Sequence, residues 1–89
     1  MNDLQGKKFY ILVEIDKDLD QYDDVISVTS YDALESARRE LSLRYNQVIS
    51  ALKDKGKSVN FFDFQEGFAA DVETDDNRWH WEIQTQVIQ

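Results

Sequence analysis

The sequence predicts a two-layer α+β fold, in which one long amphipathic helix packs on a five-stranded, mainly antiparallel sheet in the order ββαβββ. Three observations predict it. Apolar residues alternate near the start of the chain, recur every three or four residues in the middle, and alternate again toward the end. With 89 residues there is room for one domain, taken as residues 1–89, with the polar residues 1–6 expected to be flexible.

Two strands joined by a loop are predicted first. Residues 8–15 alternate, and the more apolar of the two faces holds Phe9, Ile11, Val13 and Ile15. We expect this face to lie beneath the helix, and the face with Tyr10 and Leu12 to lie on the outside of the sheet. A second strand is predicted over residues 24–29, and residues 16–23 between the two lack apolar periodicity. The pair is therefore expected to form an antiparallel hairpin.

A helix is predicted over residues 31–55. Ser30 suits its N-cap, and Gly56 suits the left-handed residue that follows many helices. One face is apolar and consists of Leu34, Ala37, Leu41, Tyr45, Val48 and Leu52. Such a helix would be about 37 Å long, against roughly 23 Å for a seven-residue strand. It should therefore lie diagonally, overhang the sheet, or break near Asn46.

Three further strands are predicted at residues 59–64, 68–74 and 78–87. A three-residue loop with Gly67 in the left-handed region should join the first two. A two-residue loop of Asp76 and Asn77 should join the last two and place Val72 opposite Trp81, because cross-strand neighbours share a face. The large aromatic residues of these strands are predicted to be core: Phe62, Phe64, Phe68, Trp79 and Trp81.

Charge is the most informative feature for function. The chain carries 18 acidic and 10 basic residues. Residues 30–57 hold six basic and four acidic side chains, so the remaining residues hold four basic and fourteen acidic ones. The acids form two clusters: Asp16, Asp18, Asp20, Asp23 and Asp24; then Asp71, Glu73, Asp75 and Asp76. A field of this sign repels nucleic acid and acidic membranes and attracts basic protein surfaces.

Other kinds of site find little support. Asp16 to Asp20 opens like a calcium-binding loop, but Gln21 and Ser27 stand where such a loop needs Gly and Glu, so no metal is expected. His80 is the only histidine and no Cys exists, so we expect neither catalysis nor a cofactor. We find no secretion signal and no apolar run long enough to span a membrane, and we expect a cytoplasmic protein.

In size, acidity and layout the chain resembles the small phage-encoded inhibitors, among them anti-CRISPR proteins, that block nucleic-acid-handling enzymes. The acidic runs 16–24 and 71–76, the absence of Cys and the compact α+β order carry this resemblance. It is a likeness of style over the whole chain. It implies a function and transfers no site residue.

The leading hypothesis is a non-enzymatic acidic binding protein that occupies a basic, nucleic-acid-binding surface of a partner protein, as a nucleic-acid mimic. The acids of both clusters are the predicted contact residues, with Tyr10 as an aromatic anchor on the outer face. One alternative is a module that self-associates as a homodimer, or docks a cellular partner, through the open sheet face. A second is an enzyme built around His80, and the plainest is that the acids only confer solubility.

Overall fold

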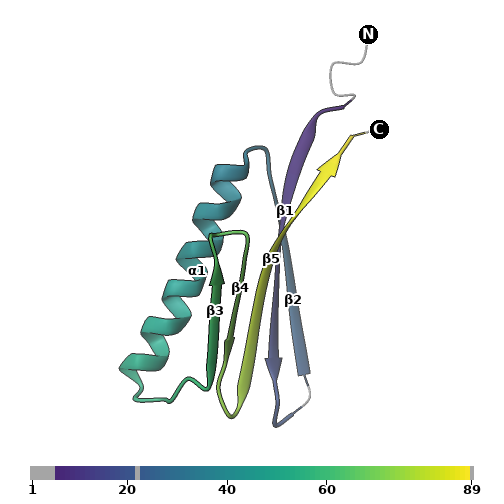
Figure 1. Ribbon diagram of the computed structural model, residues 1–89. Coiled ribbons are helices and arrows are strands. Elements are labelled where there is room, and N and C mark those ends of the chain that lie inside the picture. The colour runs from purple at the N-terminus through teal and green to yellow at the C-terminus, as the bar shows by residue number, and fades with distance from the viewer. Residues whose placement is uncertain (1–5, 22, 89) are drawn as a thin grey trace.

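The computed structural model describes residues 6–21 and 23–88 and has the predicted α+β architecture, one helix packed on a five-stranded antiparallel sheet (Figure 1). The expected flexibility of residues 1–5 falls outside the described residues. The elements are β1 (Lys8–Asp18), β2 (Asp23–Tyr31), α1 (Leu34–Asp54), β3 (Phe61–Gln65), β4 (Ala69–Glu73) and β5 (Asn77–Val87).

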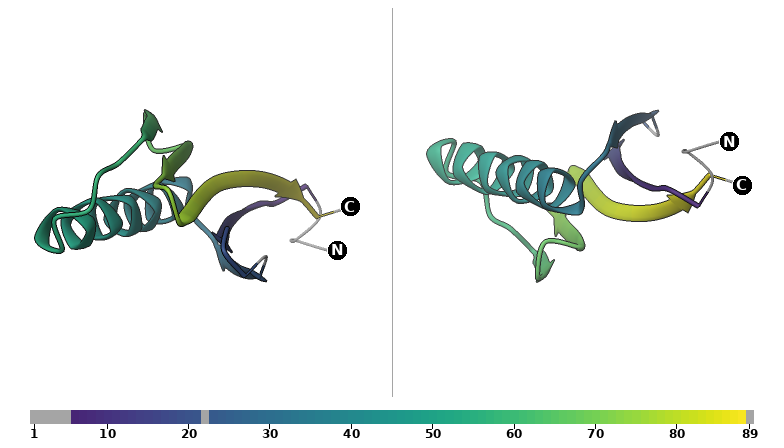
Figure 2. Two further views of the ribbon diagram at one scale, coloured as in Figure 1. Left: turned by 90° about the horizontal axis from the view of Figure 1, so that it is seen from below. Right: turned by 90° about the horizontal axis from the view of Figure 1, so that it is seen from above.

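The sheet has the strand order β2-β1-β5-β4-β3, and every neighbouring pair is antiparallel. The central strands β1 and β5 are the longest, at 11 residues each, and pair along their whole length. Figure 1 shows α1 inclined to the strands, and Figure 2 shows it on one face of the sheet only. The molecule is elongated, measuring 56 × 25 × 16 Å.

The helix is continuous and begins later than predicted. Ser30 is not its N-cap, because β2 continues through Ser30 and Tyr31 to complete its pairing with β1. The N-cap is Ala33, which makes no side-chain capping bond. The predicted role of Gly56 is confirmed: its φ is 67°, its N–H donates to the Lys53 carbonyl, and the Lys57 N–H donates to the Leu52 carbonyl. This pair of bonds is the Schellman motif, which satisfies the last helix carbonyls.

The β4–β5 loop has the predicted two residues, but they are Asp75 and Asp76. The Thr74 N–H donates to the Asn77 carbonyl at 2.9 Å, and the Thr74 hydroxyl accepts from the N–H groups of Asp76 and Asn77. A one-residue shift of the loop moves the register by two, so Val72 lies opposite Trp79 rather than Trp81. The shared face is preserved because the side-chain period of a strand is two.

The predicted orientation of β1 is wrong. Leu12 is fully buried and packs in the core with Leu41 of α1, and it lies opposite Ile83 of β5. The face with Tyr10, Leu12, Glu14 and Asp16 therefore lies on the helix side of the sheet. The more apolar face, with Ile11, Val13 and Ile15, is on the open side. Burying the less apolar face requires partners for Glu14, and Trp81 and Arg44 supply them as described below.

The core is small. Its fully buried side chains are Leu12, Ala37, Leu41, Ala70, Val72 and Trp81. Tyr45 and Val48 of the predicted helix face pack against this cluster. The prediction that Phe62, Phe64 and Phe68 are core is wrong, since they are 65%, 41% and 44% exposed. Phe62 and Phe64 lie on the edge strand β3, which receives neighbours from only one side, and Phe68 follows it in the β3–β4 turn.

Leu41 and Leu43 of α1 provide a matched test of this core. Leu41 is fully buried and Leu43 is 49% exposed. We expect Leu41→Ala to lower the free energy of unfolding by about 2–5 kcal/mol, through lost apolar burial and the cavity left behind. Leu43→Ala should change it by less than about 0.5 kcal/mol. Urea denaturation of both variants measures the difference, and equal losses would contradict the assigned helix face.

Candidate protein-binding surfaces

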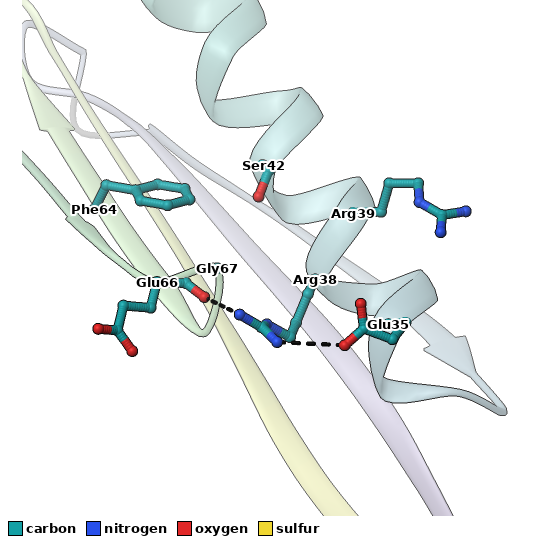
Figure 3. A pocket seen from close by; sticks show the side chains of 7 residues that line it. All are labelled: Glu35, Arg38, Arg39, Ser42, Phe64, Glu66 and Gly67. Carbon is teal, nitrogen blue, oxygen red and sulfur yellow. Dashed lines mark hydrogen bonds and ion pairs between the residues drawn. The ribbon is translucent and has the colours of Figure 1, made fainter.

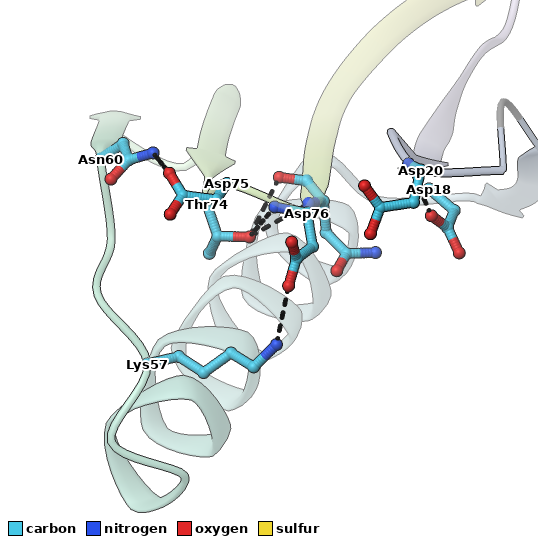
Figure 4. A network of polar contacts seen from close by, with 8 residues as sticks. Asp18, Asp20, Lys57, Asn60, Thr74, Asp75 and Asp76 are labelled. Atoms are coloured by element: carbon cyan, nitrogen blue, oxygen red, sulfur yellow. Dashed lines mark hydrogen bonds and ion pairs between the residues drawn. The ribbon is translucent and has the colours of Figure 1, made fainter.

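The two acidic clusters of the sequence meet at one end of the sheet. The β1–β2 turn and the β4–β5 turn are adjacent there (Figure 4). The Leu19 N–H donates to the Asp76 carbonyl at 2.8 Å. We call the aspartates of these turns and of the strand ends beside them the acidic end. It consists of Asp18, Asp20, Asp23, Asp24, Asp75 and Asp76.

Side-chain contacts fix the shape of the acidic end. A carboxylate oxygen of Asp18 accepts the N–H groups of Asp20 and Gln21 at 3.0 and 3.2 Å and so orders the β1–β2 turn. The amide of Asn60 donates to Asp75 at 2.6 Å. Lys57 bonds Asp76 at 3.0 Å, as Figure 4 shows.

Lys17 stands 4.0 Å from Asp24 and, with Lys57, is one of two lysines that contact the acidic end among the described residues. Two cations against six carboxylates leave this end negative. The C-terminal end of α1 lies toward the same end of the molecule (Figure 1).

Four of the predicted contact residues lie elsewhere. Asp16 is on the helix side of β1, and so is Tyr10, which corrects the expected outer position of this tyrosine. Asp71 and Glu73 lie on the open face, as predicted, but each has a cationic partner. Glu73 accepts from Arg78 at 3.1 Å, and Asp71 contacts His80.

His80 is held between two carboxylates on the open face. Its Nδ1 is 2.7 Å from Asp71 and its Nε2 is 2.9 Å from Glu82. Partial burial lowers the pKa of His80, but the hydrogen bonds and negative charges of the two acids outweigh this and raise it above 6.5. The same contact lowers the pKa of Glu82. The imidazole links β4 to β5, and in its protonated form it donates from both nitrogens, one to each carboxylate.

The helix side of β1 carries a second polar cluster. The sequence did not predict it, because Glu14 shares the face of Tyr10 and Leu12, which was expected to lie on the outside. The Trp81 indole N–H donates to Glu14 at 2.5 Å. Arg44 of α1 lies 3.5 Å from the same carboxylate and donates to Glu40 at 3.1 Å. Asp16 lies two residues along the same face, and burial together with the charge of Glu14 raises its pKa to about 6.

An apolar patch covers the open face at the β1–β2 edge. Val13 lies opposite Val28, and Ile15 lies opposite Ile26. The two β2 residues are 62% and 63% exposed, whereas the β1 residues are partly buried. Aliphatic side chains this exposed, grouped on neighbouring strands, are typical of an interaction surface.

Two hollows flank α1. The one in Figure 3, of about 510 Å³, lies between α1 and the β3–β4 turn. Arg38 lines it and donates to the Glu66 carbonyl at 2.6 Å and to Glu35 at 3.3 Å. The guanidinium also lies 4.4 Å from the Phe68 ring centre, so it ties the turn to the helix. The second hollow, of about 590 Å³, lies between α1 and β2 and is lined by Glu14, Ser27, Thr29 and Arg44 among others.

Within residues 6–21 and 23–88, no three His, Asp or Glu side chains are grouped so as to hold a metal ion. No helix in the described part of the chain is long and apolar enough to cross a membrane. Comparisons with protein-family models, with curated proteins and with solved structures find no match to this chain. Evidence for the function therefore comes from the surfaces of the molecule.

The raised pKa of Asp16 predicts a pH-dependent stability. Between its ordinary value of 3.8 and about 6, the folded protein keeps a proton that the unfolded chain has lost, so this group lowers stability as pH rises through that interval. Asp16→Asn should gain stability relative to wild type, more at pH 7 than at pH 4. Urea denaturation at both pH values measures this, with Asp20→Asn as the control for a lost surface charge. A gain independent of pH would contradict it.

A second pH prediction concerns His80. Because its folded pKa lies above the unfolded value, it stabilises the fold below pH 6.5, and that contribution is lost as pH rises through the folded pKa. We expect an NMR titration of this single histidine to give a pKa above 6.5, and Asp71→Asn to lower it. The distant Glu66→Gln is the control. An unchanged pKa in Asp71→Asn would contradict the contact.

Proposed function

We propose that this protein is a non-enzymatic binding protein whose acidic end occupies a basic surface of a partner protein. The observation that carries the proposal is the meeting of the β1–β2 and β4–β5 turns, which groups six aspartates from two distant parts of the sequence. A grouped charge of one sign speeds encounter with an oppositely charged surface and selects against acidic partners.

The partner that fits this chemistry is a protein that handles nucleic acid. Its binding groove is lined with Arg and Lys arranged to receive a chain of phosphates. The carboxylates on the two adjacent turns are negatively charged, as phosphates are, and so offer such a groove the same sign of charge. Occupation of the groove would exclude the nucleic acid, so the protein would act as a mimic and an inhibitor. The resemblance in size and acidity to small phage-encoded inhibitors points the same way.

The contacts within the acidic end support this proposal. Asp18 and Thr74 hydrogen-bond the backbone of their turns, so the carboxylates are held in position before any partner arrives. Binding through pre-organised groups loses less conformational entropy than binding through a flexible tail. Asp20 and Asp75 are exposed and so are able to reach a partner.

The test compares two charge-reversal variants with wild type. Asp20→Lys with Asp75→Lys alters the acidic end. Asp32→Lys, between β2 and α1, with Glu66→Lys, in the β3–β4 turn, makes the same change of net charge away from that end. Each is immobilised and exposed to cell lysate at low salt. Proteins retained by wild type and by the control, but not by the acidic-end variant, are identified by mass spectrometry.

We expect these proteins to include one that binds nucleic acid, and a DNA or RNA duplex to compete with this chain for the purified partner. The acidic-end variant should bind it at least roughly tenfold more weakly, and added salt should weaken the wild-type complex. Equal retention by the two variants, or an affinity insensitive to salt, would contradict the proposal.

A further inference from the structure

The edge strand β2 is unusually open to pairing. In the described sheet it has β1 as its one neighbour, so alternate backbone N–H and C=O groups along its other side face outward. Proteins commonly protect such an edge with Lys, Pro, a bulge or a short strand. The other edge strand, β3, has five residues with Asp63 at its centre. By contrast β2 has nine residues and no charged residue from Val25 to Tyr31.

The side chains of β2 are also exposed and apolar. Val25, Ile26 and Val28 are 61%, 63% and 62% exposed. Ile26 and Val28 lie on the open face beside the apolar residues of β1, and Val25 lies on the helix face. Figure 1 places β2 at the far side of the sheet from β3. The edge therefore exposes backbone and apolar side chains together.

We propose that a second copy of this chain occupies this edge, with β2 antiparallel to β2 about a two-fold axis at Ser27. The two five-stranded sheets would then join into one sheet of ten strands. Ser27 is the midpoint of β2, which runs from Asp23 to Tyr31, so this register pairs both strands over their full length. Such an interface is isologous, the commonest form of protein dimer.

The sequence of β2 is complementary to itself in this register. Ile26 of each copy lies opposite Val28 of the other on the open face, and Val25 lies opposite Thr29 on the helix face. Asp23 and Asp24 lie opposite Tyr31 and Ser30, so no two carboxylates are directly opposed. An axis at Ile26 would instead put Asp24 against Val28, and an axis at Val28 would leave Ile26 against Ser30. The Ser27 register thus pairs the most apolar area.

Charge and shape agree with a second copy as the occupant. Each chain has a net charge of −8, so two copies repel except where both surfaces are uncharged, as along residues 25–31. The antiparallel arrangement also places the two acidic ends at opposite ends of the shared edge. The radius of gyration of one chain is 15.3 Å, against about 12 Å for a compact domain of this length, so the single chain is extended rather than closed.

A substitution pair tests the interface in the full chain. Ile26→Lys with Val28→Lys adds charge to the proposed contact, and we expect it to be monomeric by sedimentation at concentrations where wild type is a dimer. The control is Phe62→Lys with Phe61→Lys, which changes exposed apolar residues of the other edge strand and should leave the dimer intact. Added salt should strengthen the wild-type dimer, because it screens the repulsion between the two acidic chains.

A cross-link tests the register independently of variant folding. The chain has no Cys, and directly opposed residues of antiparallel strands have Cα atoms about 4.5–5.5 Å apart, within the range for a disulfide. Ser27→Cys should form a covalent dimer on mild oxidation, whereas Ser50→Cys on the exposed side of α1 should not. A wild-type protein that stays monomeric at every concentration, with no Ser27→Cys cross-link, would overturn the proposal. So would a dimer that survives Ile26→Lys with Val28→Lys. Neither outcome bears on the acidic end.

Discussion

The buried indole of Trp81 determines which face of β1 lies beneath the helix. Trp81 is fully buried, so water cannot reach its N–H, which needs an acceptor within the protein. Glu14, directly opposite on β1, provides that acceptor, and Arg44 of α1 offsets its negative charge. An indole N–H left without a partner would cost about 1–3 kcal/mol. Strand β1, strand β5 and the helix are thereby joined through one carboxylate, and Leu12 follows Glu14 into the core.

The rest of the surface follows from this arrangement. With Glu14 and Asp16 turned toward the helix, the more apolar face of β1 is left on the open side, where Ile26 and Val28 of β2 extend it. The molecule consequently has two unlike surfaces: an apolar edge with no charge, and an acidic end where two turns meet. The apolar edge suits an apolar partner surface, and the acidic end suits a basic partner surface. The two roles share only Asp23 and Asp24, which lie at the ends of the proposed strand pair, so they can operate together.

Periodicity alone predicted the elements and their order, because the helical stripe ending at Gly56 and the alternating strands are local signals. It could not choose the buried face of β1, since alternation defines two faces and Leu12 lies on the less apolar one. Parity fixed the face of Val72 but not its partner, which depends on the Thr74 hydroxyl closing the turn one residue earlier. The acidic clusters are visible in the sequence, but their meeting at one end depends on the strand order.

The orientation of β1 is the point on which the core and the apolar edge depend, and a nuclear Overhauser experiment on methyl-labelled protein tests it most directly. Leu12 lies in the buried cluster with Leu41, and Val13 lies on the opposite face beside Val28. We predict cross-peaks from the Leu12 methyl groups to those of Leu41 and from the Val13 methyl groups to those of Val28. Cross-peaks from Val13 to Leu41 would show that β1 faces the other way, and would contradict this account of the core, the apolar edge and the dimer.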